Sequence, residues 1–352
     1  MPALKTRLLQ TALDAMHFSG ASRMVAPWTR GVGVIFTLHH VRAEPVPNAF
    51  APNGILDITR AFLDSVIQRV RARGYEIVSL DEVVRRLREH DTARRFACFT
   101  FDDGYADVAT QALPVFEKYD APFALYVTTG HPDGETIMWW SVLEDIVRGN
   151  ELIDAEINGS RMHLAAHTPA EKYRAFESLY WPLRALPHTE QYATIRKLAE
   201  TYRVDIRAPV RASAISWDAI GTLAASPLVT IGVHTVNHYA LSKLPLAAVS
   251  DEAQRARRLI GARIGRDPLH FCYPYGDPAS AARREFDLIR ELGFVSATTT
   301  RKGVLFAEHA RHLHALPRVS LNGDFQRLRY LDVFLTGAPF ALARRFRRLD
   351  VN

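Results

Sequence analysis

The chain has 352 residues and a formal net charge of +6, with 44 Lys and Arg residues against 38 Asp and Glu residues. This length can bury a large core, and because no clean linker is visible, one α/β domain with insertions accounts for it better than two independent domains. The two cysteines, Cys98 and Cys272, both lie in apolar runs. We therefore expect buried thiols and exclude a disulfide scaffold.

Strand-like and helical runs alternate along the chain. After a first strand near residues 34–41, we predict a helix over 61–72, a strand over 76–79, a helix over 81–88 capped by its own Asp81, a strand over 96–101, a helix over 109–119 and a strand over 123–127. The pattern resumes with a helix over 217–225, a strand over 228–233, helices over 246–262 and 281–292, and a strand over 294–297. Such repetition indicates parallel strands in a barrel-like arrangement.

Three segments depart from this alternation. Residues 131–212 are predicted to form a helical insertion, and its aromatic residues at helical spacing favour core packing: Trp139, Trp140, Tyr180 and Trp181. Residues 1–30 are expected to form a helical extension, in which Gln10, Asp14 and His17 interrupt what would be the apolar part of a signal peptide. Residues 323–352 form a basic tail.

The tail mixes apolar and basic residues between Phe325 and Arg348. It would suit either an anionic membrane surface or a terminal helix packed on the domain, with Gly337 and Pro339 interrupting a single long helix. The chain contains no apolar stretch long enough to span a bilayer. Together with the interrupted signal-peptide pattern, this leads us to expect a cytoplasmic location, with peripheral membrane association as the alternative. Nucleic-acid binding is not expected, because the basic residues lack an aromatic stacking pattern. The sequence does not predict an oligomeric state.

Two adjacent carboxylates, Asp102 and Asp103, end the apolar run Phe96–Phe101, and Gly104 offers a turn there. A turn would let both side chains serve one site, with one carboxylate binding a metal while the other remains a base. A second run ends in His234 and His238, which are four residues apart and can converge on one metal. Both motifs follow predicted strands, at the end of a barrel where catalytic groups gather. The sequence thus predicts an Asp/His/His site.

A third apolar run ends in Phe271-Cys272-Tyr273-Pro274-Tyr275-Gly276. With the runs Thr100-Phe101-Asp102-Asp103-Gly104 and His234-Thr235-Val236-Asn237-His238, it resembles the motif series of the polysaccharide deacetylases of the NodB-homology class, carbohydrate esterase family 4. The resemblance covers roughly Gly33 to Ser320. It implies that residues 31–322 form a NodB-type domain, a distorted (β/α) barrel carrying the helical insertion.

Two positions depart from that family's pattern. Phe271 stands where many members have an Arg, and residues 315–320 lack the late His of those members. A subgroup that modifies poly-N-acetylglucosamine has instead an N-terminal Y-H-x-V segment and an F-x-Y-P-Y-G loop, and His39 matches the His of that segment. His40 would point away, as a surface group or a group supporting the site. Arg318 would either orient Asp102 in place of the missing Arg or form a surface salt bridge.

The resemblance implies a role for each motif residue. Asp103, His234 and His238 would bind a divalent metal ion, for which zinc is the leading choice, Asp102 would be the general base, and His39 would protonate the departing amine. The backbone N–H of Tyr275 would stabilise the oxyanion, and Tyr273, Pro274 and Gly276 would contact the substrate. The implied reaction removes acetyl groups from N-acetylhexosamine units of an oligosaccharide, polysaccharide or glycolipid. Two alternatives remain: hydrolysis of a non-sugar amide, and a pseudoenzyme that binds saccharide without turnover.

Overall fold

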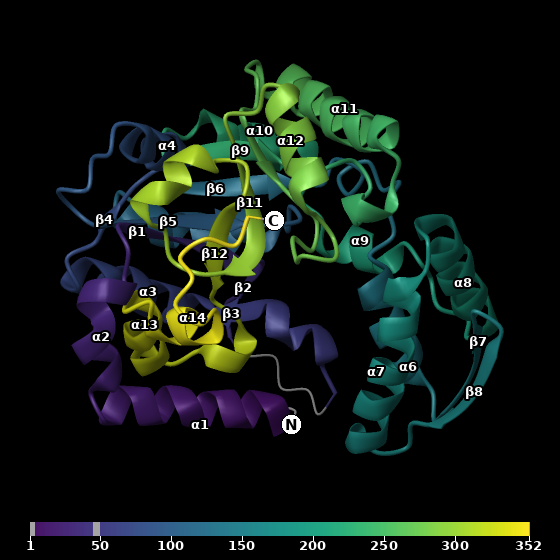
Figure 1. Ribbon diagram of the computed structural model, residues 1–352. Coiled ribbons are helices and arrows are strands. Elements are labelled where there is room, and N and C mark those ends of the chain that lie inside the picture. Colours follow the sequence, from purple (N-terminus) through teal and green to yellow (C-terminus); the bar gives the residue numbers. More distant parts are fainter. Residues whose placement is uncertain (1–3, 45–49, 352) are drawn as a thin grey trace. The chain divides into compact units, whose positions relative to one another are not determined.

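The computed structural model describes residues 4–44 and 50–351; residues 1–3 of the expected N-terminal extension and residue 352 of the tail lie outside this range. Within it, seven parallel strands close into a barrel (Figure 1). In barrel order these are β1 (Gly33–Leu38), β12 (Leu316–Ser320), β11 (Ser296–Lys302), β10 (His270–Cys272), β9 (Val229–Val233), β6 (Phe123–Val127) and β5 (Phe96–Phe101). Strand β5 pairs with β1 and closes the ring. The predicted α/β barrel is confirmed.

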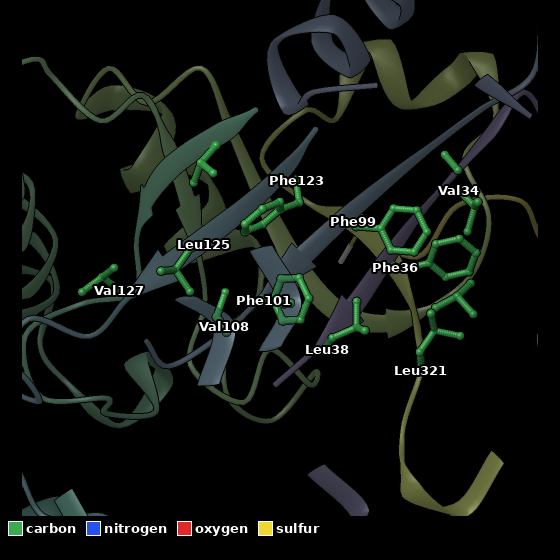
Figure 2. Packing of buried hydrophobic residues seen from close by; sticks show 14 of the residues in the cluster. Val34, Phe36, Leu38, Phe99, Phe101, Val108, Phe123, Leu125, Val127 and Leu321 are labelled. Carbon is green, nitrogen blue, oxygen red and sulfur yellow. The ribbon is translucent and has the colours of Figure 1, made fainter. Parts of the chain in front are cut away.

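Alternate residues along each strand belong to two different apolar clusters. Phe36, Phe99, Phe101 and Phe123 belong to the larger cluster and pack against residues of the surrounding helices, as Figure 2 shows for the strand side chains. Their neighbours Ile35 and Cys98 belong to a second cluster, with Cys272 and Leu316. Because successive strand residues face opposite sides and the sheet is closed, this second set fills the barrel interior. Both cysteines are buried free thiols, as expected.

The barrel belongs to a compact unit of residues 4–44, 56–129 and 215–351 of the described chain, and the other α-helices and strands of this barrel unit surround it. They are α1 (Leu4–Phe18), α2 (Ala21–Thr29), β2 (His40–Arg42), β3 (Asp57–Thr59), α3 (Arg60–Ala72), β4 (Glu76–Ile77), α4 (Leu80–Arg88), α5 (Leu113–Lys118), α10 (Trp217–Ala225), α11 (Leu246–Ile264), α12 (Arg283–Glu291), α13 (Leu328–Leu335) and α14 (Ala338–Ala343). The cap of α4 differs from the prediction, because the Ser79 side chain, and not Asp81, accepts the Glu82 N–H. The apolar residues of α13 lie in the core, and the helical tail is interrupted at Gly337.

A second compact unit contains residues 50–55 and 130–214 of the described chain. It comprises α6 (Trp139–Gly149), β7 (Leu152–Ile157), β8 (Ser160–Ala165), α7 (Pro169–Ala185), α8 (His188–Thr201) and α9 (Ala208–Ser213). Trp139 and Trp140 are buried, as expected, whereas Trp181 is exposed. The helical prediction is wrong for 152–165, where β7 and β8 form an antiparallel hairpin. Its turn is Asn158-Gly159, both with positive φ, which is the preferred two-residue hairpin connection.

No helix in the described ranges is both long and apolar enough to cross a bilayer.

Gly232 in β9 allows a large aromatic side chain to fill the barrel interior. A Cβ atom at this position would lie 2.5 Å from the Tyr126 ring and 3.1 Å from the His270 carbonyl oxygen. We expect Gly232→Ala to lower the free energy of unfolding by about 1–3 kcal/mol through overpacking. Gly221→Ala in α10 is the control: a Cβ there meets nothing within 4 Å, so helix propensity should raise stability by up to about 1 kcal/mol. Urea unfolding of both variants measures the difference, and equal stabilities would contradict this account.

Candidate active site

The first motif turns sharply at its second carboxylate. The Asp102 N–H still bonds to the Leu38 carbonyl oxygen, as a continuation of the β1–β5 pairing, and the Gly104 N–H then bonds back to the Asp102 carbonyl oxygen at 3.0 Å. The residue between them, Asp103, has φ = 72°, so the segment has the form of a classic γ-turn. The expected turn therefore lies at Asp103 as well as at Gly104, and it allows neighbouring carboxylates to serve one site.

Asp102 is held by a buried arginine from the opposite end of the sequence. Arg318 on β12 donates to both carboxylate oxygens, with Nη1 2.7 Å from Oδ1 and Nη2 2.6 Å from Oδ2. The same guanidinium donates to the Thr100 hydroxyl at 2.9 Å and to the Thr299 carbonyl oxygen at 2.8 Å. Both partners are almost fully buried. The surface salt bridge considered for Arg318 is therefore excluded, and Arg318 fixes the orientation of Asp102 as a positioning residue.

This pairing controls the charge of Asp102. Burial opposes ionisation, but the adjacent Arg318 outweighs it and holds the pKa of the Asp102 carboxyl below its usual value. Burial likewise opposes charge on Arg318, while Asp102 raises the pKa of the guanidinium. The Thr37 hydroxyl adds a donor 3.3 Å from Oδ2. Asp102 is consequently an ionised, oriented carboxylate at neutral pH.

Asp103 faces the two histidines of the second motif. Its Oδ1 lies 3.3 Å from His234 Nε2 and 3.2 Å from His238 Nε2, and all three side chains are buried. Burial opposes its charge, but His238 and His234 hold the pKa of Asp103 well below the ordinary value. Thr235 and His238 have φ of 65° and 57°, so the loop after β9 turns tightly to bring both rings together.

These three side chains suit a divalent metal ion. His234 Nδ1 lies 2.8 Å from the Cys272 carbonyl oxygen, which accepts only from an Nδ1–H, so Nε2 is the nitrogen that faces the Asp103 carboxylate and can serve as a ligand when the ring is neutral. Burial opposes charge on His234, but Cys272 and Asp103 raise the pKa of its imidazole well above the ordinary value, so a positive charge beside Asp103, either a proton or a metal ion, is favoured. The candidate ligand atoms of Asp103, His234 and His238 lie within 4.8 Å of one another. A carboxylate and two imidazoles are ligands typical of zinc and of other first-row metals.

The candidate ligand atoms of a second, overlapping group, Asp102, His234 and Cys272, also lie within 4.8 Å of one another. It is less suited to a cation, because the Arg318 guanidinium already binds both oxygens of Asp102 and lies 3.1 Å from the Cys272 sulfur. A metal ion there would meet that positive charge. The geometry favours Asp103, His234 and His238, the ligands expected from the sequence.

Glu252 on α11 supports the histidine loop and was not anticipated from the sequence. Its carboxylate accepts the backbone N–H of Val236 at 3.0 Å, the backbone N–H of Asn237 at 2.9 Å and the Asn237 side-chain amide at 2.5 Å. The side chain is 6% exposed and lies beside Val249 and Ala253 on the buried face of the helix. An acidic residue within an apolar helical stripe is a signal that could have identified it.

His39 and His40 adopt different environments after β1. His39 continues the alternation of Ile35 and Thr37, whose side chains point into the barrel. Burial lowers the pKa of the His39 imidazole, while Asp103 and Asp102 raise it. His40 is buried, with Nδ1 2.6 Å from Asp107, and is not a surface group. Asp107, three residues after the first motif, also accepts the Val41 N–H at 3.3 Å and so joins the chain after that motif to the chain after His39.

The third motif contains a second γ-turn. Gly276 N–H bonds to the Pro274 carbonyl oxygen at 2.7 Å across Tyr275, whose φ is 62°. The Tyr275 ring lies 4.7 Å from the His238 ring, so this loop borders the candidate metal ligands. Pro274 and Gly276 are buried beside it. Tyr273 points away into the core, fully buried, with its hydroxyl donating to the His314 carbonyl oxygen, so the predicted substrate contact does not apply to its side chain.

Comparison with known families agrees with these features. The family described as polysaccharide deacetylase matches residues 89–203 and 188–296, which together span more than half of the chain. The chain belongs to the polysaccharide deacetylase family. Members are hydrolases, and removal of acetyl groups from sugars is the supported activity class. No curated protein matches the sequence.

Solved structures of similar fold cover nearly the whole chain. Streptococcus pyogenes deacetylase PplD in complex with acetate is 17% identical, with a TM-score of 0.51 over 86% of this chain and 97% of its own. IcaB from Ammonifex degensii is 18% identical, with a TM-score of 0.53 over 87% of this chain and 96% of its own. A de-N-acetylase from Aggregatibacter actinomycetemcomitans is 15% identical, with a TM-score of 0.52 over 86% and 99%. At these identities the likeness concerns the fold.

Arg318→Lys should reduce kcat for acetate release by about 10²-fold with a smaller change in KM, because a single ammonium cannot hold both oxygens of Asp102. The weaker pairing should also raise the pKa of Asp102 and move the acidic limb of the pH–rate profile upward. The control is Arg86→Lys, since Arg86 is also buried and paired with two carboxylates, Glu82 and Glu76, in another part of the barrel unit. Equal losses in both variants would point to general destabilisation.

Glu252→Gln should weaken metal binding about 10–100-fold, because the amide replaces one acceptor oxygen with a donor facing the loop N–H groups. Asp251→Asn is the matched control: Asp251 neighbours Glu252 on α11, is exposed, and pairs only loosely with Arg255 at 3.4 Å. Competition with a chromophoric chelator measures both affinities. Unchanged affinity in Glu252→Gln would show that the loop needs no such support.

Proposed function

We propose that this chain is a metal-dependent hydrolase that removes N-acetyl groups from N-acetylhexosamine units, with N-acetylglucosamine as the leading candidate, in an oligosaccharide, polysaccharide or glycolipid. One observation carries the proposal. The Asp102 carboxylate, locked by Arg318, adjoins in sequence Asp103, whose carboxylate faces His234 and His238. An oriented base beside a metal-binding group is the arrangement that hydrolysis of an amide by water requires.

A divalent metal ion, zinc as the first choice, would be held by Asp103, His234 and His238, and when bound it would acidify water and polarise a carbonyl group. The protein's own residues account for the proton transfers. Asp102, kept ionised by Arg318, takes the proton from the attacking water. This leaves Arg318 as the fixed partner that returns the carboxylate to the same orientation after each turnover.

Two further groups complete the proposed reaction. The backbone N–H of Tyr275 donates to the oxyanion that forms on the acetamide carbonyl, and such a donor typically contributes about 3 kcal/mol. His39 protonates the departing amine nitrogen. Because burial lowers the pKa of His39, its imidazole is neutral at rest at neutral pH and takes up from solvent the proton that it donates, while Asp102 releases the proton of the attacking water to solvent. The products are acetate and a free amino sugar.

The proposal is tested by acetate release from a panel of N-acetylglucosamine oligomers, using metal-loaded protein, metal-depleted protein and Asp102→Asn. We expect release only with metal, and a loss of about 10²–10⁴-fold in Asp102→Asn because the general base is removed. Asp218→Asn is the control for the same chemical change at an exposed position on α10, and it should retain full activity.

The alternatives give different results. Turnover of a non-sugar N-acetyl amide, with none of the sugar panel, would favour the non-sugar hydrolase. Calorimetric binding of oligomers without acetate release, despite stoichiometric metal, would favour a saccharide-binding pseudoenzyme. Undiminished turnover in Asp102→Asn would reject the proposed base.

A further inference from the structure

The positive charge of this protein is concentrated at its two ends. Residues 1–30 contain four basic and one acidic side chain, and residues 328–352 contain five basic and two acidic side chains. These segments account for the whole net charge of +6, so residues 31–327 are electrically balanced. A proposed catalytic site within the balanced part does not explain this distribution.

The two ends pack together on the barrel unit. Helix α1 packs against α2 and α13, and α14 packs against α2 and α13 (Figure 1). The Thr29 hydroxyl at the end of α2 donates to the Thr336 carbonyl oxygen at 2.6 Å. A Cβ at Gly337 would lie 1.9 Å from the Thr29 carbonyl oxygen, so the close approach of α2 to α14 requires glycine there. The charges of both ends are thereby brought to one region.

Large apolar side chains are exposed in the same region. Met24 and Trp28 lie one turn apart on α2 and are 75% and 71% exposed. Leu342 on α14 and Phe346 beyond it are 58% and 66% exposed. Trp28 and Phe346 line one pocket of about 210 Å³, together with Phe306 and Phe340, which shows that the two ends form a continuous face. We call Met24, Trp28, Leu342, Phe346 and the arginines 344, 345 and 347 the terminal surface.

The chain after α14 turns so that arginines surround these apolar groups. The Phe346 N–H bonds to the Ala341 carbonyl oxygen and the Arg345 N–H to the Leu342 carbonyl oxygen, which is a Schellman motif. Arg345 occupies the position where glycine is usual, with φ = 51°, and Phe346 has φ = 63°. Non-glycine residues in this conformation store backbone strain, and here the strained turn presents Phe346 to solvent.

The arginines of the terminal surface form few ion pairs with acidic side chains. Among the residues that the structure describes, Arg345 and Arg347 form no ion pair, and Arg344 reaches only Asp350, at 3.7 Å. Arg348 pairs with Glu308 at 2.8 Å and is therefore not counted in the surface. An Nη2 atom of Arg344 is buried beside the pocket without a hydrogen-bond partner. Arginines without an acidic partner beside exposed Trp and Phe side chains suit an occupant that is both anionic and apolar.

We propose that the terminal surface binds the face of an anionic phospholipid bilayer, with Trp28 and Phe346 entering the interfacial region and the exposed Arg345 and Arg347 contacting lipid phosphates. Trp and Phe at the level of the headgroups, flanked by arginines, have the composition of interfacial membrane anchors. Between Ala15 and Arg30, and between Val333 and Leu349, the sequence contains no acidic residue that would repel such a surface. The bilayer is the occupant that meets both requirements at once.

Flotation of the full-length protein with vesicles tests the proposal. We expect binding to vesicles of phosphatidylcholine with phosphatidylglycerol, little binding to phosphatidylcholine alone, and release as ionic strength approaches about 1 M, where the Debye length is about 3 Å. No binding to the anionic vesicles would overturn the proposal. Equal binding to both lipid compositions, unaffected by salt, would also overturn it.

Two pairs of variants locate the surface. Arg345→Gln with Arg347→Gln should weaken binding about 25-fold, since each arginine near an anionic membrane contributes about fivefold. Trp28→Ser with Phe346→Ser should weaken it by about tenfold or more through lost apolar burial. The controls are Arg196→Gln with Lys197→Gln, which makes the same charge change at exposed positions on α8, and Trp181→Ser, which removes an equally exposed tryptophan.

Thermal unfolding and acetate release should be unchanged in all four variants, because every substituted side chain is exposed and none belongs to the proposed catalytic or metal-binding residues. Loss of binding in the control variants to the same extent would reject the terminal surface in favour of non-specific charge. Unaltered binding in both terminal-surface variants would reject it as well. Vesicle binding can be measured even if the protein releases no acetate, so a failure of the proposed deacetylase function can be distinguished from a failure of the proposed membrane binding.

Discussion

The buried pair of Asp102 and Arg318 is the interaction on which the site depends. Arg318 lies on β12 and Asp102 follows β5, and these two strands are neighbours of β1 on opposite sides. The guanidinium reaches the carboxylate across β1, so the contact requires β1 to pair with both of these strands. Burying two charges is costly unless their remaining hydrogen-bonding groups are satisfied, and here Thr100, Thr299 and the Cys272 sulfur accept the other guanidinium N–H groups. The pairing of β12 with β1 and the orientation of Asp102 are therefore coupled.

Backbone strain is concentrated at the ends of the strands that carry the site. Asp103, Thr235, His238 and Tyr275 all have positive φ, although none is glycine. Each such residue costs of order 1–3 kcal/mol and persists only where the surroundings determine it. The surroundings in this case are the buried strands β5, β9 and β10, whose outward residues pack in the main core. The core thus holds the loops in geometries that the loop sequences alone would not favour.

How much of this arrangement the sequence predicts depends on how far apart in the chain the residues that determine each feature lie. The strands at 96–101 and 123–127 and the positions of Asp102, Asp103, His234 and His238 were predicted because an apolar run followed by a polar turn is local information. The pairing of Arg318 with Asp102 remains open at the level of sequence, since it joins two residues that are 216 positions apart in the chain.

The prediction for Tyr273 is wrong although the alternation of strand side chains points to the right answer. Its neighbour Cys272 faces the barrel interior, so the Tyr273 side chain must face outward. The hairpin at 152–165 was missed despite its Asn-Gly turn, because the flanking helical periodicity dominated the interpretation.

Adjacent carboxylates in one site would ordinarily repel each other and share a proton. Here the γ-turn at Asp103 directs the two side chains to different partners, and each partner fixes a different state. Asp102 meets a permanent cation that binds both of its oxygens, which leaves the carboxylate ionised and unsuited to a metal. Asp103 faces the Nε2 atoms of His234 and His238, and the Cys272 carbonyl oxygen accepts from Nδ1 of His234, which directs Nε2 of that ring to Asp103. The division of labour between two identical side chains therefore arises from one backbone turn and from the charge type that each side chain faces.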